Sequence, residues 1–163
     1  MIEYIHGDII RTNCGLIAHQ VNCMGKMGSG VALAIKNAFP KVYLNYINYC
    51  ASEKAENLLG KTLIMPASNQ VTHHTHYVAN MFAQIDYRGD KRHTNYDALF
   101  DCLSCVLKFA KDHNLSIALP YKIGCVRGRG DWNGIVYPMI CDIFKNEDRK
   151  VFLYDLRGEI KND

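Results

Sequence analysis

Along most of this chain, segments with the pattern of a buried strand alternate with segments that have the pattern of an amphipathic helix. Short apolar runs predict strands at Ile2–His6, Leu16–Val21, Thr62–Ala67, His76–Gln84, Ser116–Pro120 and Lys150–Leu156. Apolar residues three and four apart predict helices that begin at Val31 and end or kink at Pro40, and over Lys41–Ser52, Asn95–Asn114 and Trp132–Phe144. This alternation favours a largely parallel sheet with helices on both faces.

The composition is that of a folded domain. The 163 residues are 48% hydrophobic and 21% charged, which excludes a disordered or collagen-like chain. No repeat, low-complexity tract or linker interrupts residues 1–163, so one domain is expected. The net charge of +3 implies no strong field for membranes and no strong general binding of nucleic acid.

The seven cysteines are odd in number and dispersed, unlike a disulfide framework. Residues 1–4 have neither the basic start nor the apolar stretch of a signal peptide. The apolar runs are also too short to span a membrane. We therefore expect a monomer in a reducing cytoplasm, or in the cytoplasm of a host if the chain is viral, with no membrane partner.

Two glycine-rich loops stand between a predicted strand and a predicted helix. The first loop is Asn22–Gly30 and the second is Lys122–Trp132. Ligands of parallel sheets bind in loops of this kind, because glycine admits a close approach and a helix N-terminus attracts anions. The alternative for each loop is a plain flexible connection.

Together the two loops could clamp a diphosphate between two sets of backbone amides. Neither has the spacing of a dinucleotide-binding fingerprint, and no Gly-Lys-Ser/Thr follows as in a P-loop. A nucleotide-like ligand is therefore favoured over a nucleoside triphosphate motor.

Three elements in order resemble macro domains, the family of ADP-ribose-binding modules. They are Gly7-Asp8-Ile9-Ile10, Ala18–Asn22 followed by Gly28-Ser29-Gly30-Val31-Ala32, and Gly124–Gly128. The branch most similar contains the terminal ADP-ribose protein glycohydrolase and the ADP-ribose 1″-phosphate phosphatase, with bacterial and phage members. Its cues are His19, Met27–Gly30, Lys122–Cys125 and Gly130–Trp132. The resemblance implies a three-layer α/β/α fold with a central mixed sheet of about six strands.

The resemblance also implies a ligand site without a cofactor or metal. Asp8 would accept from the adenine amino group, Asn22 would contact the distal ribose, and Gly124–Gly128 would wrap the diphosphate. The full set of implied ligand residues is Asp8, Ile9, Asn22, Met27, Gly28, Ser29, Gly30, Val31, Ile123, Gly124, Cys125, Val126, Arg127 and Gly128. The alternative for Asp8 is a residue that merely forms the turn after the strand, and the alternative for Asn22 is a cap of a helix or turn.

The expected activity is hydrolysis of ADP-ribose linkages, and the alternative is a non-catalytic reader of ADP-ribose. The glycohydrolase of this branch uses a Lys and an Asp, whose positions fall near Tyr87 and on Gly128. Asp131 is the nearest replacement as general base. The alternative is that Asp131 serves only as the N-cap of the following helix. Asn22 and His19 are the other catalytic candidates, where His19 would polarise Asn22 or a water unless it is a core residue.

Other polar clusters have simpler explanations. Cys125 could be a nucleophile, but a small residue filling a tight loop explains it as well. Cys102 and Cys105 have the spacing of a zinc half-site without a second pair of ligands. Residues 73–76 could bind a metal weakly or form a polar turn. We expect residues 86–93 to form a mobile flap over the site, because they are polar and contain a glycine.

Overall fold

A six-stranded mixed sheet forms the centre of the computed structural model, which describes residues 1–160. Along the sheet the order is β1-β6-β5-β2-β4-β3, and only β3 runs antiparallel to its neighbour. The strands are β1 (Ile2–His6), β2 (Leu16–Asn22), β3 (Thr62–Ser68), β4 (Thr75–Gln84), β5 (Ile117–Pro120) and β6 (Val151–Asp155). All six predicted strands are present.

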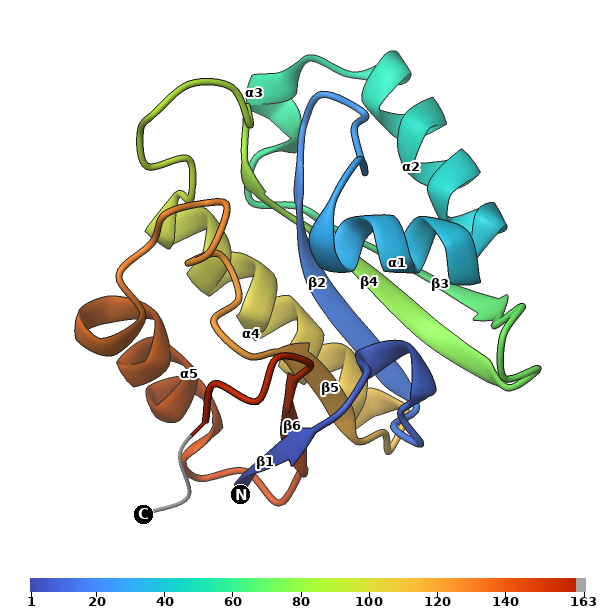
Figure 1. Ribbon diagram of the computed structural model, residues 1–163, viewed down its shortest axis with the longest axis vertical. Coiled ribbons are helices and arrows are strands. Elements are labelled where there is room, and N and C mark those ends of the chain that lie inside the picture. Colours follow the sequence, from blue (N-terminus) through green and yellow to red (C-terminus); the bar gives the residue numbers. More distant parts are fainter. Residues whose placement is uncertain (161–163) are drawn as a thin grey trace.

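Helices cover both faces of this sheet (Figure 1). One face carries α1 (Gly30–Ala38), α2 (Pro40–Ser52), the short α3 (Ala55–Leu58) and the 3-10 turn η1 (Ile9–Arg11). The other face carries α4 (Tyr96–Asp112) and α5 (Tyr137–Phe144). The predicted three-layer α/β/α fold with a mixed sheet is therefore confirmed.

Alternation along β2 assigns its side chains to the two layers. Leu16 and Ala18 pack in the cluster formed with α4 and α5, whereas Ile17 packs in the cluster formed with α1. Successive residues of a strand point to opposite faces. His19 therefore lies on the α1 face and Gln20 on the α4 face, and both interrupt an otherwise apolar strand.

The predicted helix over Trp132–Phe144 is divided in two. Residues Trp132–Val136 form a single π-helical turn, η2, in which the amide of Val136 donates to the carbonyl of Asp131 at 2.9 Å. The α-helix α5 begins only at Tyr137, with Pro138 in its first turn. Proline has no amide hydrogen, so it breaks the regular hydrogen bonding at this point. The elements η1 and α3 were not predicted.

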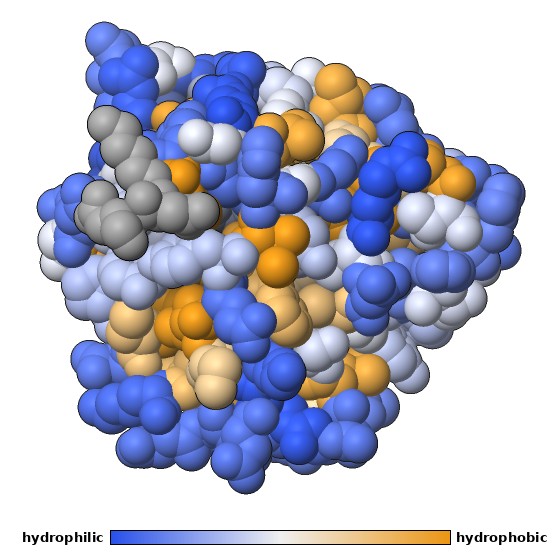
Figure 2. Space-filling model, turned by 60° about the horizontal axis from the view of Figure 1, so that its bottom comes forward, coloured by the Kyte–Doolittle hydropathy of each residue, from blue (hydrophilic) through white to orange (hydrophobic). Residues whose placement is uncertain are grey.

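No helix within residues 1–160 is long and apolar enough to cross a bilayer. Figure 2 shows the face that carries the N-terminus, which lies at the bottom of Figure 1. Hydrophilic residues occupy most of its margin, and hydrophobic residues gather in small groups nearer the middle. Such scattered apolar groups are ordinary on folded domains.

Candidate functional site

The two glycine-rich loops leave the sheet at the same edge. Strands β2 and β5 are parallel neighbours, with Leu16 paired to Ile117. The loop after β2 leads into α1, and the loop after β5 leads into η2 (Figure 1). Parallel neighbours end at a common edge, which is where ligands of open α/β sheets bind.

The carboxamide of Asn22 folds the first loop. Its Oδ1 accepts from the amides of Met24 at 3.0 Å and Lys26 at 3.3 Å, and its Nδ2 donates to the carbonyl of Lys26 at 2.8 Å. The phenol of Tyr46 on α2 also donates to Oδ1. Asn22 thus shapes the loop from a buried position, and its predicted contact with a ribose stays a prediction.

The first loop ends at an uncapped helix N-terminus. Ser29 is the N-cap residue of α1, but its side chain makes no capping hydrogen bond. Within residues 1–160 the amides of Gly30–Ala32 have no acceptor. A Cβ added at Gly28 or Gly30 would have no protein atom within 4 Å. This helix end therefore offers free donors to an anion in open space.

In the second loop the carbonyl groups of two glycines turn inward. The carbonyl of Gly124 accepts from the hydroxyl of Thr94 at 2.6 Å and from the amide of Gly130 at 2.9 Å. The carbonyl of Gly128 accepts from the amides of His93 at 2.9 Å and Thr94 at 3.0 Å. The loop is thereby pinned to the residues just before α4.

Four consecutive amides of the second loop remain free. Those of Val126, Arg127, Gly128 and Arg129 donate to no acceptor among the residues that the structure describes. Consecutive free amides form a concavity that binds anions. Phosphate binding by Gly124–Gly128 stays a prediction, and the free amides overlap that segment at Val126–Gly128.

Gly128 has no room for a side chain. A Cβ there would lie 2.6 Å from the carbonyl oxygen of Gly124 and would collide with the hydroxyl of Thr94. An aspartate at this position would therefore displace the loop. Tyr87, at the position expected for the lysine, is exposed. The packing thus gives a physical reason why no aspartate stands at Gly128.

A polar relay beneath the second loop was not predicted. Nε2 of Gln20 donates to Oγ1 of Thr94 and to Oε1 of Gln84, both at 2.8 Å. Nε2 of Gln84 donates in turn to the carbonyl of Asp86 at 2.8 Å. The only signal in the sequence is the polar Gln20 in an apolar strand, since its partners lie 64 and 74 residues away.

His19 is a neutral, buried histidine. Its Nε2 lies 2.6 Å from Oδ1 of Asn80 on β4, and because that oxygen only accepts, Nε2 carries the proton. Burial lowers the pKa of His19 to about 4. Within residues 1–160, Nδ1 has no partner. At neutral pH the ring can therefore accept a hydrogen bond through Nδ1 but holds no positive charge.

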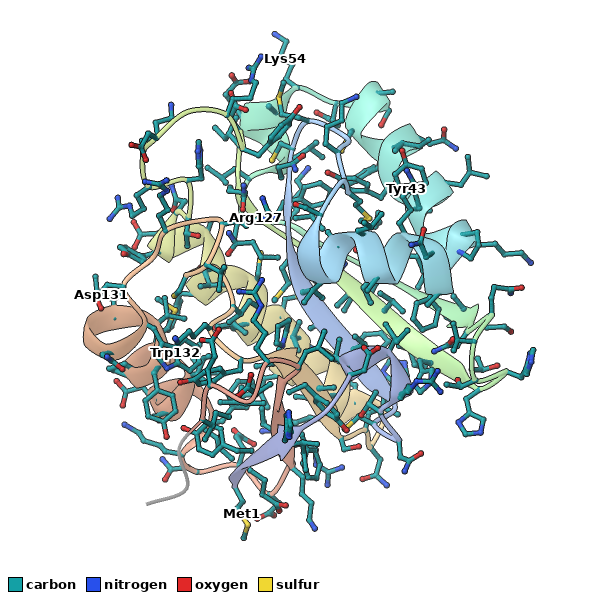
Figure 3. All side chains as sticks on the ribbon, in the orientation of Figure 1. Met1, Tyr43, Lys54, Arg127, Asp131 and Trp132 are labelled. Atoms are coloured by element: carbon teal, nitrogen blue, oxygen red, sulfur yellow. The ribbon has the colours of Figure 1, made fainter. Side chains whose placement is uncertain are left out.

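Asp131 lies at the far end of the second loop. Its Oδ1 accepts from the amide of Gly134 at 2.9 Å, so it caps η2 as the alternative interpretation expected. Figure 3 shows Asp131 at the start of the last helical segment, whereas Arg127 of the same loop lies closer to β2. Within residues 1–160 no hydrogen bond joins Asp131 to Asn22, and the role of Asp131 as a base stays a prediction.

The thiol of Cys125 is not activated. Burial and the nearby carboxylate of Asp131 raise its pKa to about 11, so the thiolate is scarce at neutral pH. On α4, Cys102 is buried and Cys105 is exposed. No group of three potential metal-binding side chains is found in residues 1–160.

Asp8 and Leu156 lie at the ends of neighbouring strands. Oδ1 of Asp8 accepts from the amide of Ile10 at 3.1 Å and caps η1. Strand β1 pairs with β6, and the amide of Gly7 donates to the carbonyl of Asp155 at 3.1 Å. Leu156 follows Asp155 directly and is 67% exposed, so an exposed apolar side chain begins just beyond the end of β6, next to the end of β1 that leads to Asp8. Leu156 was not predicted as a site residue.

Two cations of the second loop form ion pairs with acidic side chains. Nζ of Lys122 lies 2.7 Å from Oε2 of Glu159, and Arg129 pairs with Asp90. The exposed Arg127 makes no ion pair within residues 1–160. Arg127 is therefore the side chain of this loop most available to a phosphate.

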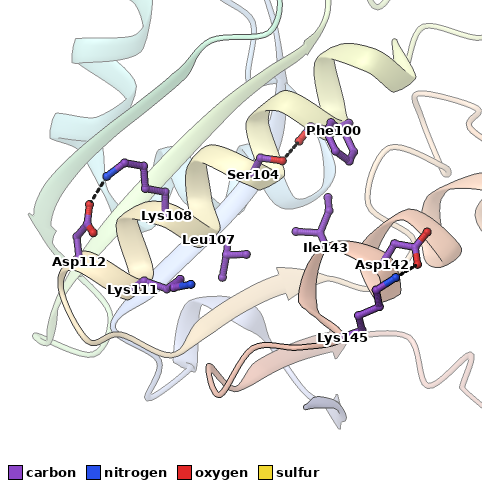
Figure 4. A pocket seen from close by; sticks show the side chains of 9 residues that line it. All are labelled: Phe100, Ser104, Leu107, Lys108, Lys111, Asp112, Asp142, Ile143 and Lys145. Atoms are coloured by element: carbon purple, nitrogen blue, oxygen red, sulfur yellow. Dashed lines mark hydrogen bonds and ion pairs between the residues drawn. The ribbon is translucent and has the colours of Figure 1, made fainter.

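A groove of about 560 Å³ lies elsewhere, between α4 and α5 (Figure 4). Phe100, Leu107 and Ile143 contribute its apolar surface. Its lysines are largely paired, as in the ion pairs of Lys108 with Asp112 and Lys145 with Asp142. None of the glycine-rich loop residues lines this groove.

The mixed sheet between two helical layers, with two glycine-rich loops at the ends of neighbouring parallel strands, is typical of α/β domains that bind a ligand at the ends of their strands. The chain belongs to the Macro domain family, whose model matches residues 18–136. It is 34% identical over 110 residues to the ADP-ribose 1″-phosphate phosphatase of Debaryomyces hansenii, covering 60% of this chain and 61% of that protein. It is 26% identical over 160 residues to the DNA ADP-ribosyl glycohydrolase of Mycobacterium tuberculosis, covering 97% of this chain and 43% of that protein.

Among solved structures, a protein of unknown function from Bacteroides thetaiotaomicron is similar over nearly the whole chain. The TM-score is 0.80 at 28% identity, and the match covers 96% of this chain and 98% of that one. The chain thus spans less than two thirds of the two curated relatives but almost all of this structural neighbour.

Proposed function

We propose that the protein binds ADP-ribose and hydrolyses the bond through which ADP-ribose is linked to a protein, a nucleic acid or a 1″-phosphate. Membership in the Macro domain family and the activities named for its relatives support this proposal. The single observation that carries it is the run of free amides at Val126–Arg129, which suits a diphosphate without a bound metal.

Each part of ADP-ribose has a matching feature. The amides at Val126–Arg129 and at the N-terminus of α1 would donate to the diphosphate. The carboxylate of Asp8 would accept from the amino group of adenine, where guanine has an acceptor. Leu156 would offer an apolar surface to the base. The distal ribose would lie against Gly28–Gly30, where the protein leaves open space.

For hydrolysis we assign three side chains. Asp131 would act as general base on a water, Asn22 would donate its remaining amide hydrogen to the distal ribose, and Nδ1 of His19 would accept a hydrogen bond. His19 cannot serve as a general acid at neutral pH, because its pKa is about 4. Asp131 lies at the other end of the second loop, so its assignment is the one most exposed to test.

A non-catalytic reader of ADP-ribose is the second candidate. It is favoured by the packing of Gly128, which leaves no room for a catalytic aspartate, and by the unactivated thiol of Cys125. Binding would be the same for a reader and an enzyme, so only turnover separates them.

Calorimetry with ADP-ribose tests binding first, and failure to bind would overturn both functions. Turnover is then measured on ADP-ribose 1″-phosphate, by phosphate release, and on glutamate-, serine- and base-linked ADP-ribose. Hydrolysis of any of these supports the enzyme and identifies the linkage. Tight binding of ADP-ribose with no turnover of any of the four substrates would support the non-catalytic reader.

We further propose that the protein works as a monomer in the cytoplasm. All seven cysteines are unpaired, which suits a reducing compartment. Light scattering after size exclusion tests the oligomeric state, and fractionation of expressing cells tests the compartment.

A further inference from the structure

Thr94 contacts the second loop at both of its inward-facing glycine carbonyls. It is buried, at 1% exposure, between residues 86–93 and α4. Its hydroxyl donates to the carbonyl of Gly124 at 2.6 Å, and its amide donates to the carbonyl of Gly128 at 3.0 Å. One residue outside the loop therefore fixes two peptide groups within it.

The direction of the Thr94 hydroxyl is set by Gln20. Nε2 of Gln20 donates to Oγ1 of Thr94, and because a hydroxyl has one proton, that proton is left for the carbonyl of Gly124. Gln20 is itself oriented by Oε1 of Gln84, which accepts the second hydrogen of its amide group. The relay runs from Gln84 through Gln20 and Thr94 to Gly124.

These bonds fix the peptide groups at the two ends of the segment that carries the free amides. In a planar trans peptide the carbonyl and the amide hydrogen of the next residue point in opposite directions. Turning the carbonyl of Gly128 toward Thr94 therefore turns the amide of Arg129 away from it. The peptide of the Gly124 carbonyl carries the amide of Cys125, which donates to the carbonyl of Lys122 at 2.9 Å. Thr94 therefore holds the peptide groups on either side of those that carry the free amides of Val126, Arg127 and Gly128, and it holds the peptide of the Arg129 amide itself.

We propose that Thr94 is the positioning residue of the anion-binding loop, and that Gln20 orients its hydroxyl for this task. The inference rests on the proposed binding of ADP-ribose and adds the side chains that preorganise the diphosphate subsite. Thr94 touches neither phosphate nor ribose and acts only through the loop backbone. Preorganised amides bind an anion without an ordering cost at the moment of binding.

Thr94→Val is the direct test. The valine keeps the shape but removes the proton from a buried carbonyl, and its methyl group stands where a 2.6 Å hydrogen bond was. The Kd for ADP-ribose should rise about tenfold, the cost of one unsatisfied buried group. Thr94→Ser keeps the hydroxyl and should restore affinity to within about threefold of wild type. Thr72→Val, in the turn between β3 and β4 at the opposite end of the sheet, is the matched control.

A ligand comparison separates positioning from general loss of structure. Adenosine lacks the diphosphate, so its binding, followed by NMR, should be the same in wild type and Thr94→Val. In the ligand-free variant the amide resonances of residues 126–129 should shift and exchange faster with solvent. Gln20→Leu leaves Thr94 in place and should give a weaker effect of the same kind, which keeps the inference testable if Thr94→Val does not fold.

The outcomes are distinct. Wild type that binds no ADP-ribose overturns the proposed function and the inference with it. Wild type that binds ADP-ribose while Thr94→Val binds equally well overturns the inference alone. Equal losses of ADP-ribose and adenosine binding in Thr94→Val, or no rescue by serine, would also overturn it.

Discussion

The phenol of Tyr46 on α2 donates its proton to Asn22 at the end of β2, with the hydroxyl 2.9 Å from Oδ1 and 2.7 Å from the carbonyl oxygen. Tyr46 is fully buried, and burial raises its pKa above the ordinary value, so the proton stays in place. Asn22 in turn holds the amides of Met24 and Lys26. The shape of the first loop thus depends on a side chain 24 residues further along.

Replacing this phenol should loosen the first loop. Tyr46→Phe removes the shared hydrogen bond and should lower the free energy of unfolding by about 1 kcal/mol. The Kd for ADP-ribose should rise severalfold, because the chain entering α1 is less ordered. Denaturant unfolding and calorimetry measure both quantities. Tyr49→Phe, the same exchange one turn along α2, is the control, and an equal effect there would contradict the prediction.

Alanine at Gly128 should lower stability, whereas alanine at Gly28 should lower the affinity for ADP-ribose without changing stability. Gly128→Ala forces a Cβ against the carbonyl of Gly124 and should lower the free energy of unfolding by roughly 1–3 kcal/mol, as overpacking does. Gly28→Ala meets no protein atom within 4 Å and should leave the melting temperature unchanged. It should nevertheless weaken ADP-ribose binding, since the methyl group fills the space assigned to the ribose. Unchanged affinity in Gly28→Ala would show that the distal ribose does not lie at this position.

The stability of the protein should fall as the pH drops from 6.5 to 4. The pKa of His19 is about 4 in the folded protein against 6.5 for a free imidazole, so the unfolded chain binds an extra proton in this window. The shift corresponds to roughly 3 kcal/mol lost by pH 4. His19→Gln cannot titrate and should show a flatter profile over the same range in urea unfolding. Identical slopes would contradict the assignment.

Two substitutions separate the possible roles of Asp131. Asparagine also caps helices well, so Asp131→Asn should keep the melting temperature, whereas Asp131→Ala should lose about 1 kcal/mol of stability. A general base would make both variants at least about a hundredfold slower in hydrolysis. Full activity in Asp131→Asn would show that Asp131 only caps η2 and is not the general base.

The layers of the fold could be predicted from the sequence because they depend on local periodicity. The apolar spacing is visible directly in the sequence of β2, which begins at Leu16, and of α4, which contains Leu99. The missed elements lack such a signal: α3 has four residues and η1 has three, too few for a period to show. The π-helical turn at Trp132 has a hydrogen-bonding pattern that apolar spacing does not distinguish from an α-helix.

The candidate site could be predicted only in part. The glycines of the two loops were identified by spacing, and the structure places them at one edge of the sheet. The role of Asn22 in folding its own loop and the relay from Gln20 to Thr94 depend on tertiary contacts. Nothing in the spacing of Gln20, Gln84 and Thr94 shows that the fold brings them together.

The free amides at Val126–Arg129 have a consequence for how this surface can vary. Backbone donors carry no net charge, do not titrate, and are supplied by every residue type except proline. Substituting the side chains of Val126, Arg127 and Arg129 would leave the donors themselves intact. What must be preserved is the pair of glycines and the threonine that fold the backbone, so a loop of this kind can change its outward character while it retains its ligand.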